Sequence, residues 1–147
     1  RPQRIDPGSW RLQVSGQVQQ PMELPYDELD GNAETVTATL ECTGGWYTTQ
    51  RWTGVTVGRI LERARLKPDA ASVTIRSVTG YHRRFSLAEA SRLVLATRVG
   101  SERLSHRHGS PLRLVAPGKR GYDWVKWVTA IEVNDTSKWL QPPLPLE

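Results

Sequence analysis

The chain has 147 residues, a formal net charge of +5 and a hydrophobic content of 37%. This length is typical of one globular domain with a sizeable core. We therefore expect residues 1–147 to form a single domain, with an N-terminal arm at 1–9 and a proline-rich tail at 140–147. The single cysteine excludes a disulfide within the chain.

We expect neither a membrane span nor a signal peptide in these residues. The longest aliphatic run, 93–96 (LVLA), is far shorter than the ~20 apolar residues that cross a bilayer. Residues 1–4 (RPQR) lead into polar sequence without the apolar segment of a signal peptide. The expectation is a mature protein or a soluble piece of a longer one.

The excess of basic residues does not indicate a nucleic-acid partner. Lysines and arginines are scattered between acidic residues and form no long run of like charge. A dedicated nucleic-acid module would more often show a basic stripe with exposed aromatic residues or a known binding motif. We expect no nucleic-acid partner, and small anionic ligands are a better use for isolated arginines and lysines.

The first half of the chain alternates between predicted strands and one helix. Alternating apolar and polar residues predict a strand over 10–15, followed by a loop or short helical turn over 22–29. Residues 36–42 are rich in β-branched side chains and predict a second strand. Apolar residues with a 3.6-residue period then predict an amphipathic helix over 54–66, which Pro68 ends.

Strands dominate the second half as well. Ser86, followed three residues later by Glu89, forms a capping box that predicts a helix over 87–95. The remaining strands are predicted at 72–78, 111–115 and 122–133. Strands with a few short helices and no regular alternation favour a mixed α+β, β-rich fold.

Cys42 is the first candidate for a chemical role. It ends a predicted strand and precedes Gly44 and Gly45, where the sulfur would lie at the edge of an open loop. Such a thiolate can be a nucleophile or a soft metal ligand. The alternative is an inert cysteine packed as a small apolar side chain.

His106 and His108 suggest a zinc site only weakly. A structural zinc ion needs four ligands, and only His82 and Cys42 could be added to this pair. Solvated imidazoles in a surface turn are the competing interpretation. The sequence also contains no nucleophile-elbow, Walker A or dinucleotide-binding motif.

Three neighbouring segments combine cations with glycines: HGSPLR at 108–113, PGKRGY at 117–122 and VKW at 125–127. Arginine and lysine suit phosphate, and glycine-rich turns expose backbone N–H groups to an anion. The sequence therefore offers a candidate anion site. Solvated cations at strand ends are the alternative.

Six segments match one known family in order and spacing. They are WRLQVSG at 10–16, LECTGGW at 40–46, WTGV at 52–55, GY at 80–81, HGSPLRLV at 108–115 and VKW at 125–127. Over nearly its whole length the chain resembles the molybdopterin-binding oxidoreductase domain of the sulfite oxidase superfamily. The resemblance implies a sulfite-oxidase-like fold and a molybdopterin cofactor that carries molybdenum.

The resemblance also implies roles for individual residues. Cys42 would be the thiolate ligand of molybdenum, beside the two dithiolene sulfurs of one pterin. His108 and Arg113 would bind the pterin, with Arg113 suited to its phosphate. The remaining implied cofactor contacts are Ser77, Trp124, Val125 and Lys126, with Trp124 and Val125 acting through their backbones. Candidates for the pocket wall are Trp46, Tyr47 and Tyr81.

The implied activity is two-electron oxygen-atom transfer. The resemblance suggests a small-molecule or sulfoxide-type substrate, a redox partner such as a haem protein, and an extracytoplasmic location in a bacterium. Sulfite is not favoured, because Thr43 to Tyr47 replaces the arginine-containing loop of sulfite oxidases. Nothing in residues 1–9 matches the family's N-terminal pterin-contacting segment. A cofactor-less binding or interaction module with the same fold is therefore the alternative.

Overall fold

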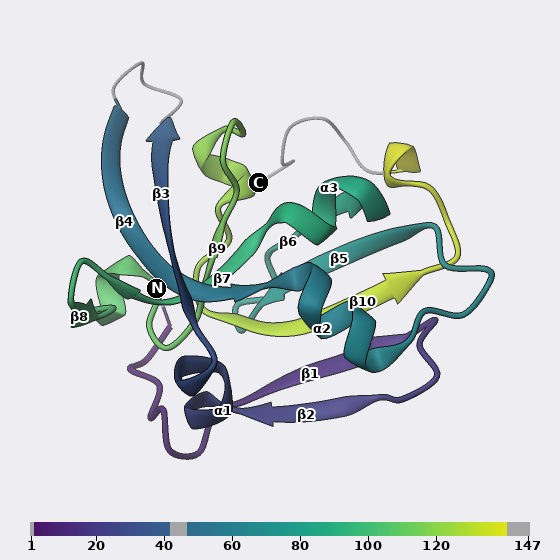
Figure 1. Cartoon of the computed structure of the whole chain (residues 1–147), viewed down its shortest axis with the longest axis horizontal. Helices are drawn as coiled ribbons and strands as arrows, with labels where there is room; N and C mark the ends of the chain where they lie inside the picture. The colour runs from purple at the N-terminus through teal and green to yellow at the C-terminus, as the bar shows by residue number, and fades with distance from the viewer. Residues whose placement is uncertain (1, 42–46, 141–147) are drawn as a thin grey trace.

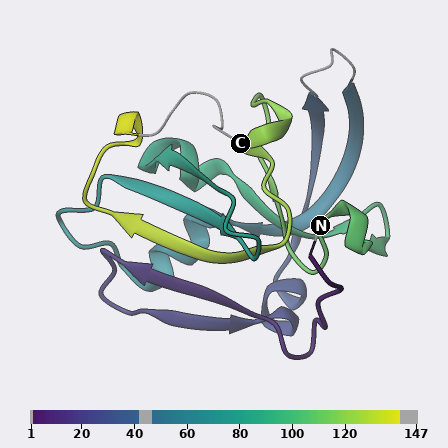
Figure 2. The ribbon, with the colours of Figure 1, turned by 180° about the vertical axis from the view of Figure 1, so that it is seen from behind.

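The computed structural model describes residues 2–41 and 47–140 (Figure 1). The first of its two sheets has the strand order β2-β1-β10-β5-β6. These strands are β1 (Arg11–Gly16), β2 (Met22–Pro25), β5 (Ser72–Ser77), β6 (His82–Ser86) and β10 (Val128–Asn134). Strand β10 lies between β1 and β5, pairing parallel with β1 and antiparallel with β5 (Figure 2). The first and the last strand of the chain thus pair with each other in one sheet.

The second sheet has the order β3-β4-β7-β8, and β9 pairs with β7 beside this path. Its strands are β3 (Glu34–Glu41), β4 (Tyr47–Thr56), β7 (Val94–Val99), β8 (Glu102–Arg103) and β9 (Arg113–Val115). Strands β3 and β4 form a long hairpin that extends from the body (Figure 1). Threonines face each other across it, as in the 2.8 Å hydrogen bond between the hydroxyls of Thr39 and Thr49.

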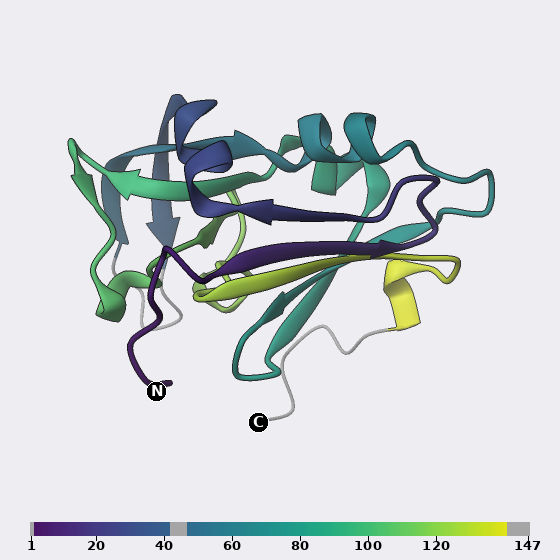
Figure 3. The same cartoon turned by 90° about the horizontal axis from the view of Figure 1, so that it is seen from below.

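Three short α-helices and three 3₁₀ turns complete the described part of the chain. The helices are α1 (Tyr26–Gly31), α2 (Val57–Ala64) and α3 (Leu87–Arg92), and the turns are η1 (His106–His108), η2 (Gly121–Asp123) and η3 (Lys138–Leu140). Helices α1 and α2 lie along one side of the molecule (Figure 3). No helix among residues 2–41 and 47–140 is long and apolar enough to cross a lipid bilayer.

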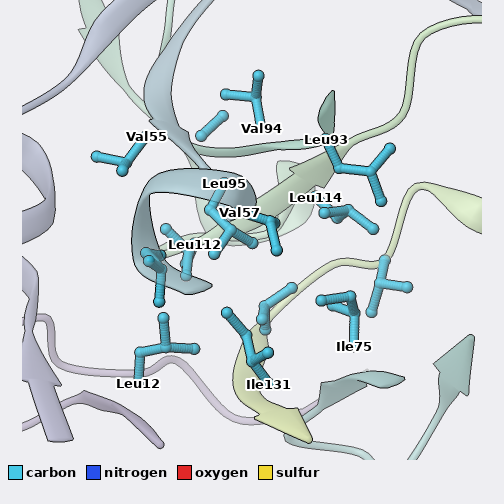
Figure 4. Packing of buried hydrophobic residues seen from close by; sticks show 14 of the residues in the cluster. Leu12, Val55, Val57, Ile75, Leu93, Val94, Leu95, Leu112, Leu114 and Ile131 are labelled. Atoms are coloured by element: carbon cyan, nitrogen blue, oxygen red, sulfur yellow. The ribbon is translucent and has the colours of Figure 1, made fainter. Parts of the chain in front are cut away.

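The core lies where the two sheets and α2 meet. Side chains from both sheets point toward one another there (Figure 4). Fully buried members are Leu12, Val57, Ile75, Leu95, Leu112, Leu114 and Ile131. Burial of an aliphatic side chain of this size contributes roughly 1.5–3 kcal/mol, so this shared core holds the two sheets together.

The structure confirms the β-rich α+β fold but moves several boundaries. The helix predicted over 54–66 begins only at Val57, because residues 54–56 pair with β7 as the end of β4. The helix predicted over 87–95 does contain the capping box, yet it ends at Arg92 because Val94 starts β7. Both corrections replace the end of a helix with a sheet pairing that sequence periodicity does not reveal.

The strand predicted over 122–133 is the prediction that differs most from the structure. Its first part contains the end of η2 and an irregular segment, and only Val128 onward is a strand. The strand predicted over 111–115 shortens to β9, and residues 22–29 contain both β2 and the start of α1. Strands β2, β4, β6, β7 and β8 are not predicted as strands from the sequence.

Gly16 ends β1 at a close approach to β10. Its φ is +92°, and a Cβ placed there would lie 2.1 Å from the backbone oxygen of Val133. We expect Gly16→Ala to lower the free energy of unfolding by about 2–4 kcal/mol, because backbone strain and the clash add. Gly31→Ala is the matched control: a Cβ there meets nothing within 4 Å. Urea unfolding of the two variants measures the difference, and equal stabilities would contradict the prediction.

Glu89 links α3 to two later segments. Its carboxylate accepts hydrogen bonds from Lys119, from Lys138 (2.6 Å) and from the backbone N–H of Ser86 (3.0 Å). Partial burial alone would raise the pKa of Glu89, but the hydrogen bonds from Lys119, Lys138 and Ser86 outweigh it and lower the pKa to about 2. The ionised form is therefore the one that the folded protein stabilises.

This depressed pKa predicts acid sensitivity. Because the pKa of Glu89 is lower in the folded than in the unfolded chain, its stabilisation is complete above about pH 4.5 and is lost as the pH falls toward 2. We expect Glu89→Gln to remove about 2 kcal/mol at neutral pH, allowing for partial exposure, and to flatten the acid slope. Unfolding by urea between pH 7 and pH 3 tests this, with Glu62→Gln on the exposed face of α2 as the control.

Candidate functional site

Arg113 is a buried cation at the junction of the two sheets. Its side chain is 4% exposed, and its flanking residues Leu112 and Leu114 are fully buried. The guanidinium lies over the rings of Trp52, at 5.3 Å, and Trp124, at 5.8 Å. Arginine tolerates this setting because its delocalised charge is weakly hydrated and interacts favourably with aromatic faces. The two tryptophans therefore hold a permanent positive charge inside the fold.

The turn η1 carries His108 toward Arg113. The hydroxyl of Ser105 caps the turn, accepting a hydrogen bond from the backbone N–H of His108 and lying 2.7 Å from its Nδ1. One Nη of Arg113 donates to the backbone oxygen of His108 at 3.3 Å. These bonds hold the imidazole on Ser105 and the backbone of His108 on the guanidinium of Arg113.

Gly109 allows a third cation to join this pair. Its φ is +105°, and a Cβ there would lie 3.1 Å from the Cβ of Lys126 and 3.2 Å from that of Arg113. Only glycine fits this combination of left-handed backbone and close packing without strain. Gly109 therefore lets the η1 turn and the chain around Lys126 pack directly on one another.

Several hydrogen bonds hold Lys126 in this place. The ammonium group of Lys126 donates to the backbone oxygen of Arg107 at 3.1 Å, and the indole N–H of Trp127 donates to that of His106 at 2.8 Å. The backbone N–H of Trp127 donates to Gly109 at 3.3 Å. These bonds fix Lys126 close to His108 and Arg113. We call His108, Arg113 and Lys126 the cationic triad.

The charges around the triad favour an anion. The pKa of His108 is lowered first by burial and then by the positive charges of Arg113, Lys126 and Arg107. Every charge acting on this imidazole is thus positive. A phosphate accepts hydrogen bonds from arginine, lysine and imidazole together, so the donor set fits the phosphate of a cofactor. The residues present are consistent with molybdopterin.

A cavity of about 230 Å³ is lined in part by Lys126. Its wall includes Ser77, Tyr81, Trp124, Val125, Lys126 and Trp127. Four of the six described residues named as cofactor contacts therefore line one cavity, and Lys126 joins it to the remaining two, His108 and Arg113. Ligand sites usually measure about 300–1,000 Å³, so this cavity could hold only part of a cofactor.

Some predicted contacts are already engaged within the protein. The hydroxyl of Ser77 accepts hydrogen bonds from the backbone and side chain of Thr79. The backbone N–H of Trp124 donates to Gly121, and the carbonyl of Val125 accepts from Leu114. These bonds fix the cavity wall. Because Thr79 uses both acceptor lone pairs of the Ser77 hydroxyl, the O–H donor is what Ser77 retains for a further partner.

Cys42 and Trp46 lie outside the described residues. The strands on either side of them are described: β3 ends at Glu41, which pairs with Tyr47 at the start of β4. The proposed pocket-wall residue Tyr81 does line the cavity. The His106 and His108 pair gathers no metal cluster, since the described residues contain no group of three or more His, Cys, Asp and Glu side chains.

Sequence reasoning missed three contributors to the site. Ser105 caps the η1 turn, Gly109 permits the close approach of Lys126, and Trp52 supports the guanidinium of Arg113. The serine and glycine had a local signal, because a hydroxyl three residues before His108 and a glycine after it are typical of a capped turn. Trp52 belongs to the family segment WTGV, but its contact with Arg113 had no local signal because it joins residues far apart in the chain.

The fold brings Arg113, Lys126 and His108 together as donors for an anionic group. A model of the oxidoreductase molybdopterin binding domain family matches residues 1–140. The chain therefore belongs to this family, and molybdopterin is the cofactor of the class. The resemblance drawn from the sequence motifs is confirmed.

Relatives and a solved structure agree with this assignment. The chain is 33% identical over 141 residues to the protein-methionine-sulfoxide reductase catalytic subunit of Xanthomonas campestris pv. campestris, with 83% of this chain and 44% of the relative covered. It is 29% identical over 172 residues to the NADPH nitrate reductase of Mycosarcoma maydis, covering 86% of this chain and 18% of the relative.

The solved structure is that of the sulfane dehydrogenase SoxCD from Paracoccus pantotrophus. It matches with a TM-score of 0.84 and 25% identity, over 90% of this chain and 40% of that chain. The sulfite-oxidase-like fold is thereby confirmed. The chain spans about half or less of the length of these proteins.

The surroundings of His108 give a direct test of the triad. Because positive charges help to lower the pKa of His108, we expect Lys126→Met to raise it and inorganic phosphate to raise it in the wild-type protein. A histidine NMR titration with and without phosphate measures both shifts. Lys67→Met, at an exposed lysine, is the control and should leave the pKa of His108 unchanged. A phosphate-insensitive His108 would contradict the anion site.

Proposed function

We propose that the chain is the cofactor domain of a molybdenum oxidoreductase that performs two-electron oxygen-atom transfer. In this proposal, molybdenum is held by the thiolate of Cys42 and by one pterin dithiolene. The observation that carries the proposal is the cationic triad around Gly109 in a chain of the molybdopterin-binding family. When bound, the cofactor supplies the redox chemistry, and the protein supplies binding, orientation and the pocket.

Each residue of the triad would make a different contact with the cofactor's phosphate. Arg113 offers a planar guanidinium that lies over two aromatic rings, and Lys126 offers a point charge beside it. His108 would complete the set through its imidazole, which a bound anion favours in the protonated form. Ser77, with the backbones of Trp124 and Val125, would contact the cofactor along the cavity wall.

A sulfoxide is the substrate class that we favour. A relative of this chain, the protein-methionine-sulfoxide reductase catalytic subunit of Xanthomonas campestris pv. campestris, carries this activity in its name. The balanced reaction takes a sulfoxide, two electrons and two protons to a thioether and water. A redox partner such as a haem protein would supply the electrons, and an extracytoplasmic location in a bacterium completes the proposal.

The decisive measurement is metal analysis of protein from a host that makes the cofactor. We expect about one molybdenum per chain, as one Cys42 and one triad imply, and an optical band from thiolate-to-molybdenum charge transfer. Cys42→Ser should abolish reduction of a methionine sulfoxide peptide and remove the band. Loss of activity with the band intact would contradict the ligand role of Cys42.

Lys126→Met tests the phosphate site separately. We expect its molybdopterin content to fall about tenfold, because loss of a charge-assisted hydrogen bond to phosphate costs ~1.5–3 kcal/mol. Lys67→Met should retain the wild-type content. Wild-type protein without molybdenum, from a host that loads other molybdenum enzymes, would overturn the proposal and favour the cofactor-less binding module.

A further inference from the structure

Two charged side chains are buried in the described part of the chain: Arg113 and Arg83. Arg113 belongs to the cationic triad, whereas Arg83 lies on β6 and outside it. A buried charge is costly unless it is paired, so its retention calls for a specific structural or functional reason. Arg83 is 5% exposed, which places it almost as deep as Arg113.

The partner of Arg83 is Asp123, in η2. The Nε of Arg83 donates to Oδ1 of Asp123 at 2.9 Å, and the two side chains are 6% and 17% exposed. The guanidinium also lies 5.4 Å from the ring centre of Tyr122. Arg83 therefore holds two consecutive residues that come directly before the segment of Trp124, Val125 and Lys126.

The same hairpin, β5–β6, contacts this segment at both ends. Before it, the hydroxyl of Tyr81 donates to the backbone oxygen of Tyr122. After it, the backbone N–H of Val78 donates to the oxygen of Trp127 at 2.8 Å. Trp127 has a φ of +53°, an uncommon conformation for a bulky residue that the surrounding contacts must hold. Lys126 is thus bracketed by contacts from one rigid element.

We propose that Arg83 and Asp123 are positioning residues for the cofactor segment, acting through its backbone without touching the cofactor. Their ion pair orders residues 122–127 before the cofactor arrives, so that binding need not spend free energy on ordering them. It also keeps Lys126 where its ammonium group donates to the backbone oxygen of Arg107, in the η1 turn that carries His108. This inference rests on the proposed function, because the positioned group is the phosphate site.

Asp123→Asn tests the proposal, with Asp30→Asn as a matched control. Asp30 pairs with Arg98 at 2.9 Å, its side chain is 16% exposed, and the pair joins α1 to β7 instead of holding the cofactor segment. Both substitutions remove the charge of a carboxylate that is 16–17% exposed, without changing side-chain size. General loss of stability should therefore be comparable, and only Asp123→Asn should affect the cofactor.

The first measurement is the rate at which purified holoprotein releases molybdopterin, followed by fluorescence of the oxidised pterin after dilution. We expect release to be about tenfold faster in Asp123→Asn and within about twofold of wild type in Asp30→Asn, where tenfold corresponds to ~1.4 kcal/mol. The second measurement is amide hydrogen exchange of the protein without cofactor. Exchange at Trp124 and Trp127, whose backbone N–H groups donate to the oxygens of Gly121 and Gly109, should accelerate only in Asp123→Asn.

Each outcome separates this inference from the proposed function. Equal release rates and equal exchange in the two variants would overturn the positioning role while leaving the cofactor domain intact. Wild-type protein that carries no molybdopterin would overturn both. Where Asp123→Asn does not fold, Arg83→Lys keeps a buried cation opposite Asp123 and loses the guanidinium geometry, and release at the wild-type rate would again overturn the role.

Discussion

The short strand β9 is the constraint on which the remainder of the structure depends. It pairs with β7 on one side, while Leu114 donates to Val125 and Val128 donates to Leu112 on the other. This double pairing joins the two sheets and buries the strand on both faces. Arg113 at its start is consequently carried into the interior, where Trp52 and Trp124 receive the guanidinium. Strand β9, which joins the two sheets, therefore also positions Arg113, the candidate phosphate ligand.

The fold thus contains two buried arginines with different partners. Arg83 is neutralised by a nearby carboxylate, as burial of a charge normally requires. Arg113 lies across Gly109 from a second cation, Lys126, and both positive charges help to lower the pKa of His108. Such a concentration of positive charge is unfavourable by itself and is relieved by a bound anion. The contrast within one protein supports a structural role for one arginine and a ligand-binding role for the other.

Local sequence signals succeeded where local interactions decide the structure. The capping box at Ser86 and Glu89 begins α3 as predicted, and alternation located β1 and β3. The same reasoning failed at residues 122–127, which have the composition of a strand. Pairing of this segment with β9 and its anchoring on the β5–β6 hairpin prevent a regular strand there. Neither interaction leaves a periodic pattern in the sequence.

The sequence by itself determined the β-rich class, the family and the cofactor, because motifs in a fixed order carry that information without knowledge of contacts. It also named His108, Arg113 and Lys126 as residues for one ligand. Tertiary structure alone decided that these cations converge with Trp52 behind them and that Arg83 and Asp123 brace the segment from outside. These contacts join residues tens of positions apart in the chain. The packing of buried strands brings them together, and local propensity does not encode that packing.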